Sequence, residues 1–255
     1  MRTPVMAANW KMNNTWAQTA LLAQAVSNRT DDSWDSVEVV ICPATCNIKA
    51  AQSVIEFDRA PFHLGAQNVH WEESGAFTGE VSCSMLSEMG ATHCIVGHSE
   101  RREWFCETDE MVNRKVAALL ASHMTPIVCV GESLAIRDQE TYVDYICNQV
   151  HAAFAGLTPQ AVASCIVAYE PIWAIGTGRT ATPEQAQEVC ASIRSALAAD
   201  FGKECADAVR ILYGGSVNTA NIEGLMSQPD IDGGLVGGAS LDADSFKDLV
   251  KACTR

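Results

Sequence analysis

The amino-acid sequence predicts an α/β fold in which helices cover a parallel sheet. Short apolar runs rich in Val, Ile and Cys recur along the 255 residues, and a segment with helical spacing follows each of them. There are eight such units, and their mean length of about 32 residues is the size of a strand–helix repeat. No Pro/Ser-rich linker, charge block or low-complexity stretch divides the sequence, so we expect a single domain over residues 1–255.

The expected strands are the eight apolar runs. In chain order they are Val5–Lys11, Val37–Cys42, Phe62–Ala66, Thr92–Gly97, Thr125–Gly131, Ser164–Tyr169, Val209–Tyr213 and Ile231–Gly237. Among the expected helices, one has a clear start, because Thr182 and Gln185 form a capping box and Pro183 takes the first helical position. The apolar residues of this helix and of the last one recur every three or four positions: Ala186, Val189, Cys190, Ile193 and Leu197, then Phe246, Leu249, Val250 and Cys253.

Two architectures are compatible with this order of elements. Eight consecutive units fit a closed (β/α)8 barrel, but about six to eight units can also build an open doubly wound sheet, and periodicity does not distinguish the two. Both architectures place the chemistry at the carboxyl ends of the strands. Residues that directly follow each apolar run are therefore the candidate site residues.

Charge and cysteine usage exclude several classes of partner. A net charge of −14 disfavours binding to nucleic acid or to an anionic membrane surface, so an anionic substrate needs a locally positive cleft. The 11 cysteines contain no CxxC pair, which is typical of reduced thiols in the cytoplasm. The sequence has no 18-residue apolar run and no apolar stretch typical of a signal peptide, so we expect a cytoplasmic protein without a membrane partner.

Asn9 and Lys11 stand at the end of the first apolar run. They alternate with Trp10, so both polar side chains are expected on one face of the strand, which is the inside of a barrel. A lysine there is costly unless it meets an anion, and it could then stabilise developing negative charge. A lone lysine is more often a surface residue.

His98 follows the fourth run, where an imidazole could exchange protons with a substrate. A lone histidine is more often a structural residue. The other five histidines lack the ligand spacing of a metal site, and no cysteine pair joins them in a zinc pattern, so we predict no metal.

Glu170 follows the sixth run and begins a segment in which an apolar stretch precedes two glycines, Gly176 and Gly178. Under an apolar lid a carboxylate loses water, its pKa rises, and it becomes a better base toward a weakly acidic C–H. Residues 176–181 (GTGRTA) also match a dinucleotide-binding fingerprint. The first glycine of that fingerprint should end the strand directly, whereas Gly176 comes six residues after Glu170.

Two glycine pairs follow the last two runs, in the segments Gly214–Ser216 and Gly237–Gly238. Glycine lets backbone amides approach an anion closely, and in barrels these loops commonly bind phosphate. A single glycine at a strand end is otherwise simply a turn residue.

Four motifs taken together resemble the triosephosphate isomerase family. They are residues 9–13 (NWKMN), 98–102 (HSERR), 169–178 (YEPIWAIGTG) and 213–218 (YGGSVN). They occur in the family's order over nearly the whole chain, and residues 65–80 resemble the family's subunit-contact loop. The resemblance implies a single-domain TIM barrel. It also implies a cofactor-free aldose–ketose isomerase of glycolysis and gluconeogenesis that interconverts dihydroxyacetone phosphate and glyceraldehyde 3-phosphate.

The resemblance also implies roles for individual residues, carried over from the family's known mechanism. Glu170 is expected to move a proton between neighbouring carbons, and His98 to act as a neutral electrophile. Lys11 and Asn9 are expected to stabilise the oxyanion. Cys129 is expected to pack beside the base.

The remaining implied positions concern the phosphate, the lid and the subunit contact. The residues expected at the phosphate are Gly176, Ser216, Gly237 and Gly238, under a lid formed by Ile172–Thr177. Glu100 is expected to support the site from behind. Thr78 is expected to make a homodimer contact near the catalytic lysine of the partner.

Three alternatives stay open at the level of sequence. A phosphate-binding barrel isomerase for a larger substrate would share Gly237 and Gly238 but lack the lid motif that follows Glu170. A catalytically inactive barrel kept as a binding protein should have lost the base, the lysine or the histidine. A dehydrogenase would bind a nicotinamide dinucleotide.

Overall fold

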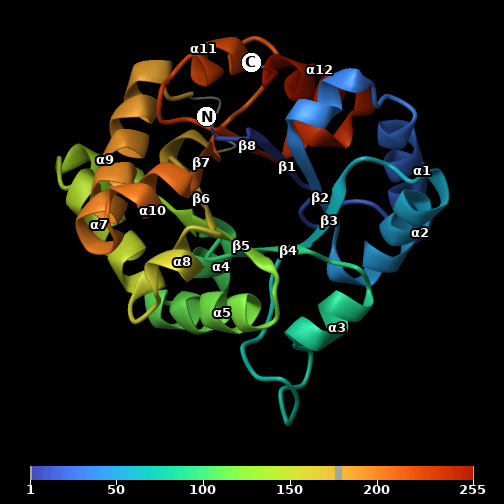
Figure 1. The fold of residues 1–255 in the computed structure, drawn as a ribbon, viewed down its shortest axis with the longest axis horizontal. Coiled ribbons are helices and arrows are strands. Elements are labelled where there is room, and N and C mark those ends of the chain that lie inside the picture. The colour runs from blue at the N-terminus through green and yellow to red at the C-terminus, as the bar shows by residue number, and fades with distance from the viewer. Residues whose placement is uncertain (1, 176–179, 255) are drawn as a thin grey trace.

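The computed structural model describes residues 2–175 and 180–254, in which eight parallel strands close into a barrel in chain order from β1 to β8. The barrel closes where β1 pairs with β8, with Val5 opposite Gly233. Helices surround the barrel on its outside (Figure 1). The closed barrel excludes the open doubly wound sheet and confirms the (β/α)8 fold implied by the sequence.

Each strand lies within the apolar run that predicted it. The strands are β1 (Val5–Asn9), β2 (Glu38–Cys42), β3 (His63–Ala66), β4 (His93–Val96), β5 (Thr125–Val130), β6 (Ile166–Tyr169), β7 (Arg210–Tyr213) and β8 (Gly233–Val236). The predicted runs extend beyond the strands by up to two residues at either end, where the pairing between strands has already ended.

The helices alternate with the strands. They are α1 (Trp16–Ser27), α2 (Ile48–Asp58), α3 (Cys83–Glu88), α4 (Ser99–Phe105), α5 (Asp109–Ala121), α6 (Leu134–Asp138), α7 (Tyr142–Phe154), α8 (Pro159–Val162), α9 (Pro183–Phe201), α10 (Lys203–Ala208), α11 (Ile222–Met226) and α12 (Ala243–Ala252). Short 3-10 turns lie at Asp32–Ser36, Thr45–Asn47, Ile172–Ala174 and Gly238–Leu241. None of the helices in the described ranges is long and apolar enough to cross a membrane.

The start of α9 confirms the predicted capping box. The Thr182 hydroxyl accepts a hydrogen bond from the Gln185 amide at 3.2 Å, and the Gln185 side chain accepts one from the Thr182 amide at 3.0 Å. Every residue of the predicted apolar stripes on α9 and on the last helix is buried. These stripes pack on the outer face of the barrel.

The core has two apolar layers, separated by the wall of the barrel. Side chains alternate along each strand, so Val5 and Ala7 point into the barrel while Met6 and Ala8 face the helices. The inner layer consists of Val5, Ala7, Val40, Cys42, Ile95, Ile127, Cys129, Ile166, Ala168, Leu212 and Leu235. This layer fills the barrel below the carboxyl ends of the strands.

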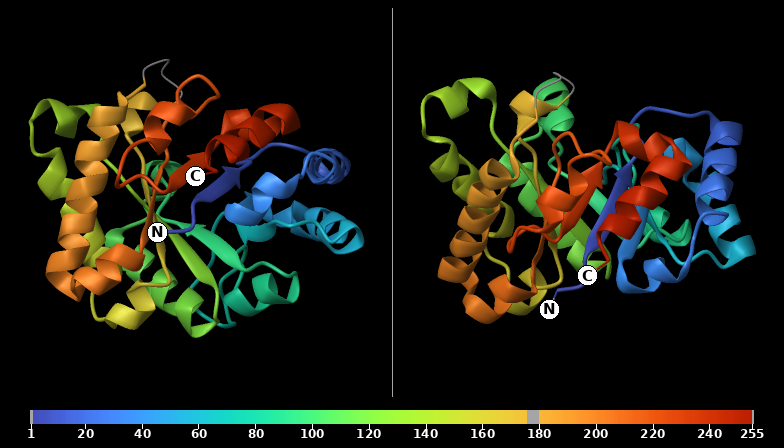
Figure 2. Two further views of the ribbon diagram at one scale, coloured as in Figure 1. Left: turned by 45° about the horizontal axis from the view of Figure 1, so that its top comes forward. Right: turned by 90° about the horizontal axis from the view of Figure 1, so that it is seen from above.

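The two ends of the chain lie close together, near the amino end of β1 and away from the carboxyl ends of the strands (Figure 2). A long loop between β3 and α3 projects from the barrel (Figure 1). Its residues 72–80 are all exposed.

Candidate active site

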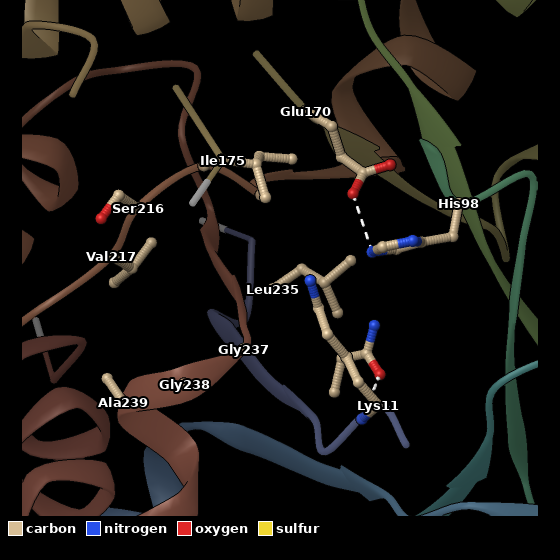
Figure 3. A pocket seen from close by; sticks show the side chains of 13 residues that line it. Lys11, His98, Glu170, Ile175, Ser216, Val217, Leu235, Gly237, Gly238 and Ala239 are labelled. Atoms are coloured by element: carbon tan, nitrogen blue, oxygen red, sulfur yellow. Dashed lines mark hydrogen bonds and ion pairs between the residues drawn. The ribbon is translucent and has the colours of Figure 1, made fainter. Parts of the chain in front are cut away.

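A cavity of about 300 Å³ lies at the carboxyl ends of the strands (Figure 3). It is lined by Asn9, Lys11, His98, Glu170, Ile175, Gly214, Gly215, Ser216, Val217, Leu235, Gly237, Gly238 and Ala239. Seven residues predicted for the site therefore meet in one place: Asn9, Lys11, His98, Glu170, Ser216, Gly237 and Gly238. Gly176 and the end of the predicted lid, Thr177, lie outside the described residues.

Glu170 follows β6, and its side chain is almost fully buried, with 2% of it exposed. One carboxylate oxygen lies 2.9 Å from His98 Nε2, the contact drawn as a dashed line in Figure 3. The other oxygen accepts a hydrogen bond from the Ser99 amide at 2.9 Å. The Ser99 hydroxyl donates a further hydrogen bond, at 3.3 Å, to the oxygen that contacts His98. The carboxylate is thus held against the start of α4.

His98 is the residue before α4 and caps that helix with its own ring. The Glu100 amide donates to His98 Nδ1 at 3.3 Å. Because Nδ1 accepts this bond, the proton of a neutral ring belongs on Nε2, which then donates to Glu170. The free amides at the start of a helix make this arrangement possible.

The expected rise in the pKa of Glu170 is wrong for this arrangement of side chains. Burial alone raises the pKa of Glu170, but the charge and hydrogen bond of His98, the Ser99 amide and the charge of Lys11 together lower it below its usual value. Burial alone lowers the pKa of His98, yet the neighbouring Glu170 carboxylate, with a smaller effect from Glu100, raises it. The two side chains therefore stabilise each other's charged forms.

Lys11 lines the cavity, but it lies beyond the end of β1 and not on a face of the strand as alternation predicted. β1 ends at Asn9, and Lys11 has a left-handed backbone with φ of 51°. Its amide donates to the side chain of Asn9 at 3.0 Å, and its carbonyl oxygen accepts from the side chain of Gln67 at 2.9 Å. Its Nζ lies 2.6 Å from a carboxylate oxygen of Glu100. These contacts hold the lysine at the mouth of the barrel.

Ser216, Gly237 and Gly238 lie on the opposite side of the cavity from His98 (Figure 3). A Cβ added to Gly238 meets nothing within 4 Å, so the backbone there faces open space. A Cβ added to Gly237 would lie 3.4 Å from Cε of Lys11, which brings the lysine beside this backbone. The cavity therefore combines a positive charge with approachable backbone.

Cys129, predicted to lie beside Glu170, is fully buried in β5. Burial, and next the charge of Glu170, raise the pKa of its thiol well above the ordinary value, so the thiol stays protonated. All 11 cysteines are free thiols. Within residues 2–175 and 180–254, no group of three or more His, Cys, Asp and Glu side chains could hold a metal ion.

Sequence reasoning gave no role to several residues at the site, and Leu235 and Ser99 are two of them. Leu235 lies in β8 and points inward, and alternation along a recognised strand could have identified it. Ser99 bonds to Glu170 from 71 positions away. Its signals were its place in the motif 98–102 and at the start of the helix after the fourth run, where backbone amides are free.

Comparison with known proteins gives a consistent result over nearly the whole chain. A family model described as triosephosphate isomerase matches residues 4–253. The triosephosphate isomerase of Lactobacillus gasseri is 48% identical over 250 residues, covering 98% of both chains. That of Endomicrobium trichonymphae is 49% identical over 251 residues, covering 98% of this chain and 99% of its own. That of Saccharopolyspora erythraea is 48% identical over 249 residues, covering 97% of this chain and 95% of its own. The chain belongs to the triosephosphate isomerase family.

Proposed function

We propose that this chain is a triosephosphate isomerase that interconverts dihydroxyacetone phosphate and D-glyceraldehyde 3-phosphate through an enediolate, without a cofactor. The observation that carries the proposal is a single cavity in which a carboxylate, an imidazole, an ammonium group and glycine backbone meet. Membership of the family adds the substrate, since its members are named for it. The name also points to a role in glycolysis and gluconeogenesis.

Glu170 is the proposed base. In the family's mechanism it removes a proton from the carbon beside the carbonyl and returns it to the neighbouring carbon. His98 acts as a neutral electrophile that polarises the carbonyl and passes protons between the two oxygens of the enediolate. The proton on Nε2 of His98, inferred from the Glu100–Nδ1 bond, supports this role.

Lys11 and Asn9 are proposed to stabilise the negative oxygen of the enediolate. Support comes from their shared place in the cavity and from the bond between the Lys11 amide and the Asn9 side chain. Glu100 is the proposed supporting residue, because its carboxylate contacts Lys11 Nζ at 2.6 Å. Cys129 is the proposed packing neighbour of Glu170.

The phosphate of the substrate is proposed to bind at Ser216, Gly237 and Gly238, with Gly176 joining from the lid when it closes. A closed, dry site strengthens the charge interactions inside it and suppresses loss of phosphate from the enediolate. The positive charge of Lys11 beside Gly237 supports this location on a protein whose net charge is −14.

We also propose a cytoplasmic homodimer. The projecting loop between β3 and α3 carries Thr78, and Phe77 on it is 42% exposed. A groove of about 680 Å³ beside Asn9 and Lys11 could accept the same loop of a second copy. Its wall includes Met12, which is 96% exposed and would be covered by such a contact. The 11 free thiols agree with a reducing compartment.

Isomerase activity on glyceraldehyde 3-phosphate, read through a coupled dehydrogenase, tests the proposed reaction. Wild type should be active, and both Glu170→Gln and Glu170→Asp should lose most of kcat, because one removes the base and the other shortens its reach. An inactive wild type that still binds phosphate would favour another barrel isomerase or an inactive binding protein. Binding of a nicotinamide dinucleotide in calorimetry would favour the dehydrogenase.

Analytical ultracentrifugation tests the assembly. We expect a dimer, and the variant Thr78→Arg should shift the protein toward monomer with a matching loss of activity. A monomer that is fully active would contradict the proposed role of the loop.

A further inference from the structure

The main chain around Glu170 is hydrogen-bonded to the end of β5 and to the residues that follow it. The Glu170 amide donates to the Val130 carbonyl oxygen at 2.7 Å, and the Ile172 amide donates to the Glu132 carbonyl oxygen at 3.1 Å. Gly131 lies between these two bonds. The position of Glu170 therefore depends on the position of the short segment around Gly131.

Gly131 approaches Glu170 more closely than any residue with a side chain could. A Cβ at position 131 would lie 1.8 Å from the carbonyl oxygen of Glu170 and 2.8 Å from its carbonyl carbon. Glycine is used where two backbones approach in this way. Any shift of Gly131 toward β6 must then displace Glu170 as well.

The amide of Gly131 is bound by a side chain rather than by a strand. The registered pairing between β4 and β5 ends with Val96 opposite Val128, so β4 supplies no acceptor at position 131. Instead, the Gly131 amide donates to Oε1 of Gln149 at 2.8 Å. Gln149 lies in α7 and is 3% exposed, so bulk water does not compete for this bond.

We propose that Gln149 is a positioning residue that fixes Gly131 and, through it, the main chain of Glu170. The inference rests on the proposed function, in which Glu170 is the base. Gln149 does not line the described cavity and so has no direct contact with substrate there. Misplacing a catalytic group by about 1 Å costs on the order of 100-fold in rate. The effect of losing the Gln149 bond should therefore appear in kcat rather than in KM.

The test compares Gln149→Met with Val150→Ala. The methionine variant has a similar size and loses the acceptor, whereas the alanine variant removes buried atoms from the same helix and keeps the Gln149 amide. We expect kcat of Gln149→Met to fall roughly 10- to 100-fold, with KM changed by less than about threefold. Val150→Ala should keep its kcat even though urea unfolding shows a lower stability.

Two further variants complete the test. Gln149→Glu keeps an oxygen that can accept from Gly131 and should recover most of kcat. Gln149→Asn places its oxygen one methylene short, should show the same loss as Gln149→Met, and takes its place if that variant does not fold. The inference is overturned if the variants lacking the acceptor keep kcat, or if kcat follows stability equally in Val150→Ala. An inactive wild type would instead contradict the proposed function.

Discussion

The carboxylate of Glu38 offers a quantitative test of the electrostatics at the amino end of the barrel. Glu38 begins β2, where one of its oxygens lies 2.9 Å from His93 Nε2 and the other accepts from Arg210 at 2.8 Å. The hydrogen bond from His93, followed by the charge of Arg210 and smaller effects of the charges on His93 and His63, lowers the pKa of Glu38 from 4.5 to about 2 despite burial. Ionised Glu38 therefore stabilises the folded state.

The magnitude follows from this pKa. The difference between 4.5 and about 2 corresponds to roughly 3.4 kcal/mol, at about 1.36 kcal/mol for each pKa unit. The side chain of Glu38 is 20% exposed, and screening by solvent reduces the contribution, so we expect about 1.5–2 kcal/mol. Because the folded pKa is lowered, the stabilisation is complete above the unfolded pKa near 4.5 and is lost as the pH falls toward 2.

Urea unfolding of wild type and Glu38→Gln, at one protein concentration from pH 6 to pH 3.5, measures this contribution. Glutamine resembles the protonated acid, so the variant should be less stable by about 1.5–2 kcal/mol at pH 6. The gap should narrow by roughly two thirds at pH 3.5, as expected for a contribution of about 1.5–2 kcal/mol that is lost below the unfolded pKa. Isomerase activity should stay at the wild-type level, because the amino end of the barrel is remote from the cavity. A gap that is constant, or that widens as the pH falls, would refute the reasoning.

Three further predictions concern the site, a helix start and a buried ion pair. Gly214→Ala should lower kcat roughly tenfold, because its Cβ would lie 3.0 Å from Cγ of Glu170 and restrict the base, and steady-state kinetics measure this. Thr182→Ala should lower the free energy of unfolding by about 1 kcal/mol through loss of the cap of α9, measured with urea. Lys115→Met should cost roughly 3 kcal/mol in the same assay, because Glu107, 2.6 Å away, would keep a buried charge with one partner fewer; an unchanged stability would contradict this.

The eight strands could be predicted because parallel strands covered on both faces are continuous apolar runs in sequence, whereas their closure into a barrel was implied only by the resemblance to the family. Each strand of the barrel lies in an apolar run, and each run ends near the turn to the next helix. The limits of the strands could not be predicted in the same way. Whether Lys11 belongs to β1 depends on its pairing with a neighbouring strand. Its left-handed backbone is accompanied by a hydrogen bond to its carbonyl oxygen from Gln67, which is 56 positions away.

The residues of the cavity could be anticipated because the carboxyl ends of the strands converge at one mouth. Their protonation behaviour could not, since it depends on distances between groups from different units. Ser99 and His98 come from the fourth unit and Glu170 from the sixth, and only the closed barrel brings them within 2.9 Å. The predicted rise in the pKa of Glu170 was wrong for this reason.

The expected rise in the pKa of Glu170 and its lowering in this structure are consistent if they belong to different positions of the side chain. Held by His98 and Ser99, the carboxylate is stabilised and its pKa is low. A side chain that moved away from these partners while remaining buried would lose most of the compensation for burial, and its pKa would rise even though the charge of Lys11 still lowers it. The same movement removes the charge that raises the pKa of His98 and returns the ring toward its neutral form. A basic carboxylate and a neutral imidazole would therefore arise together, at the step where the proposed reaction needs both.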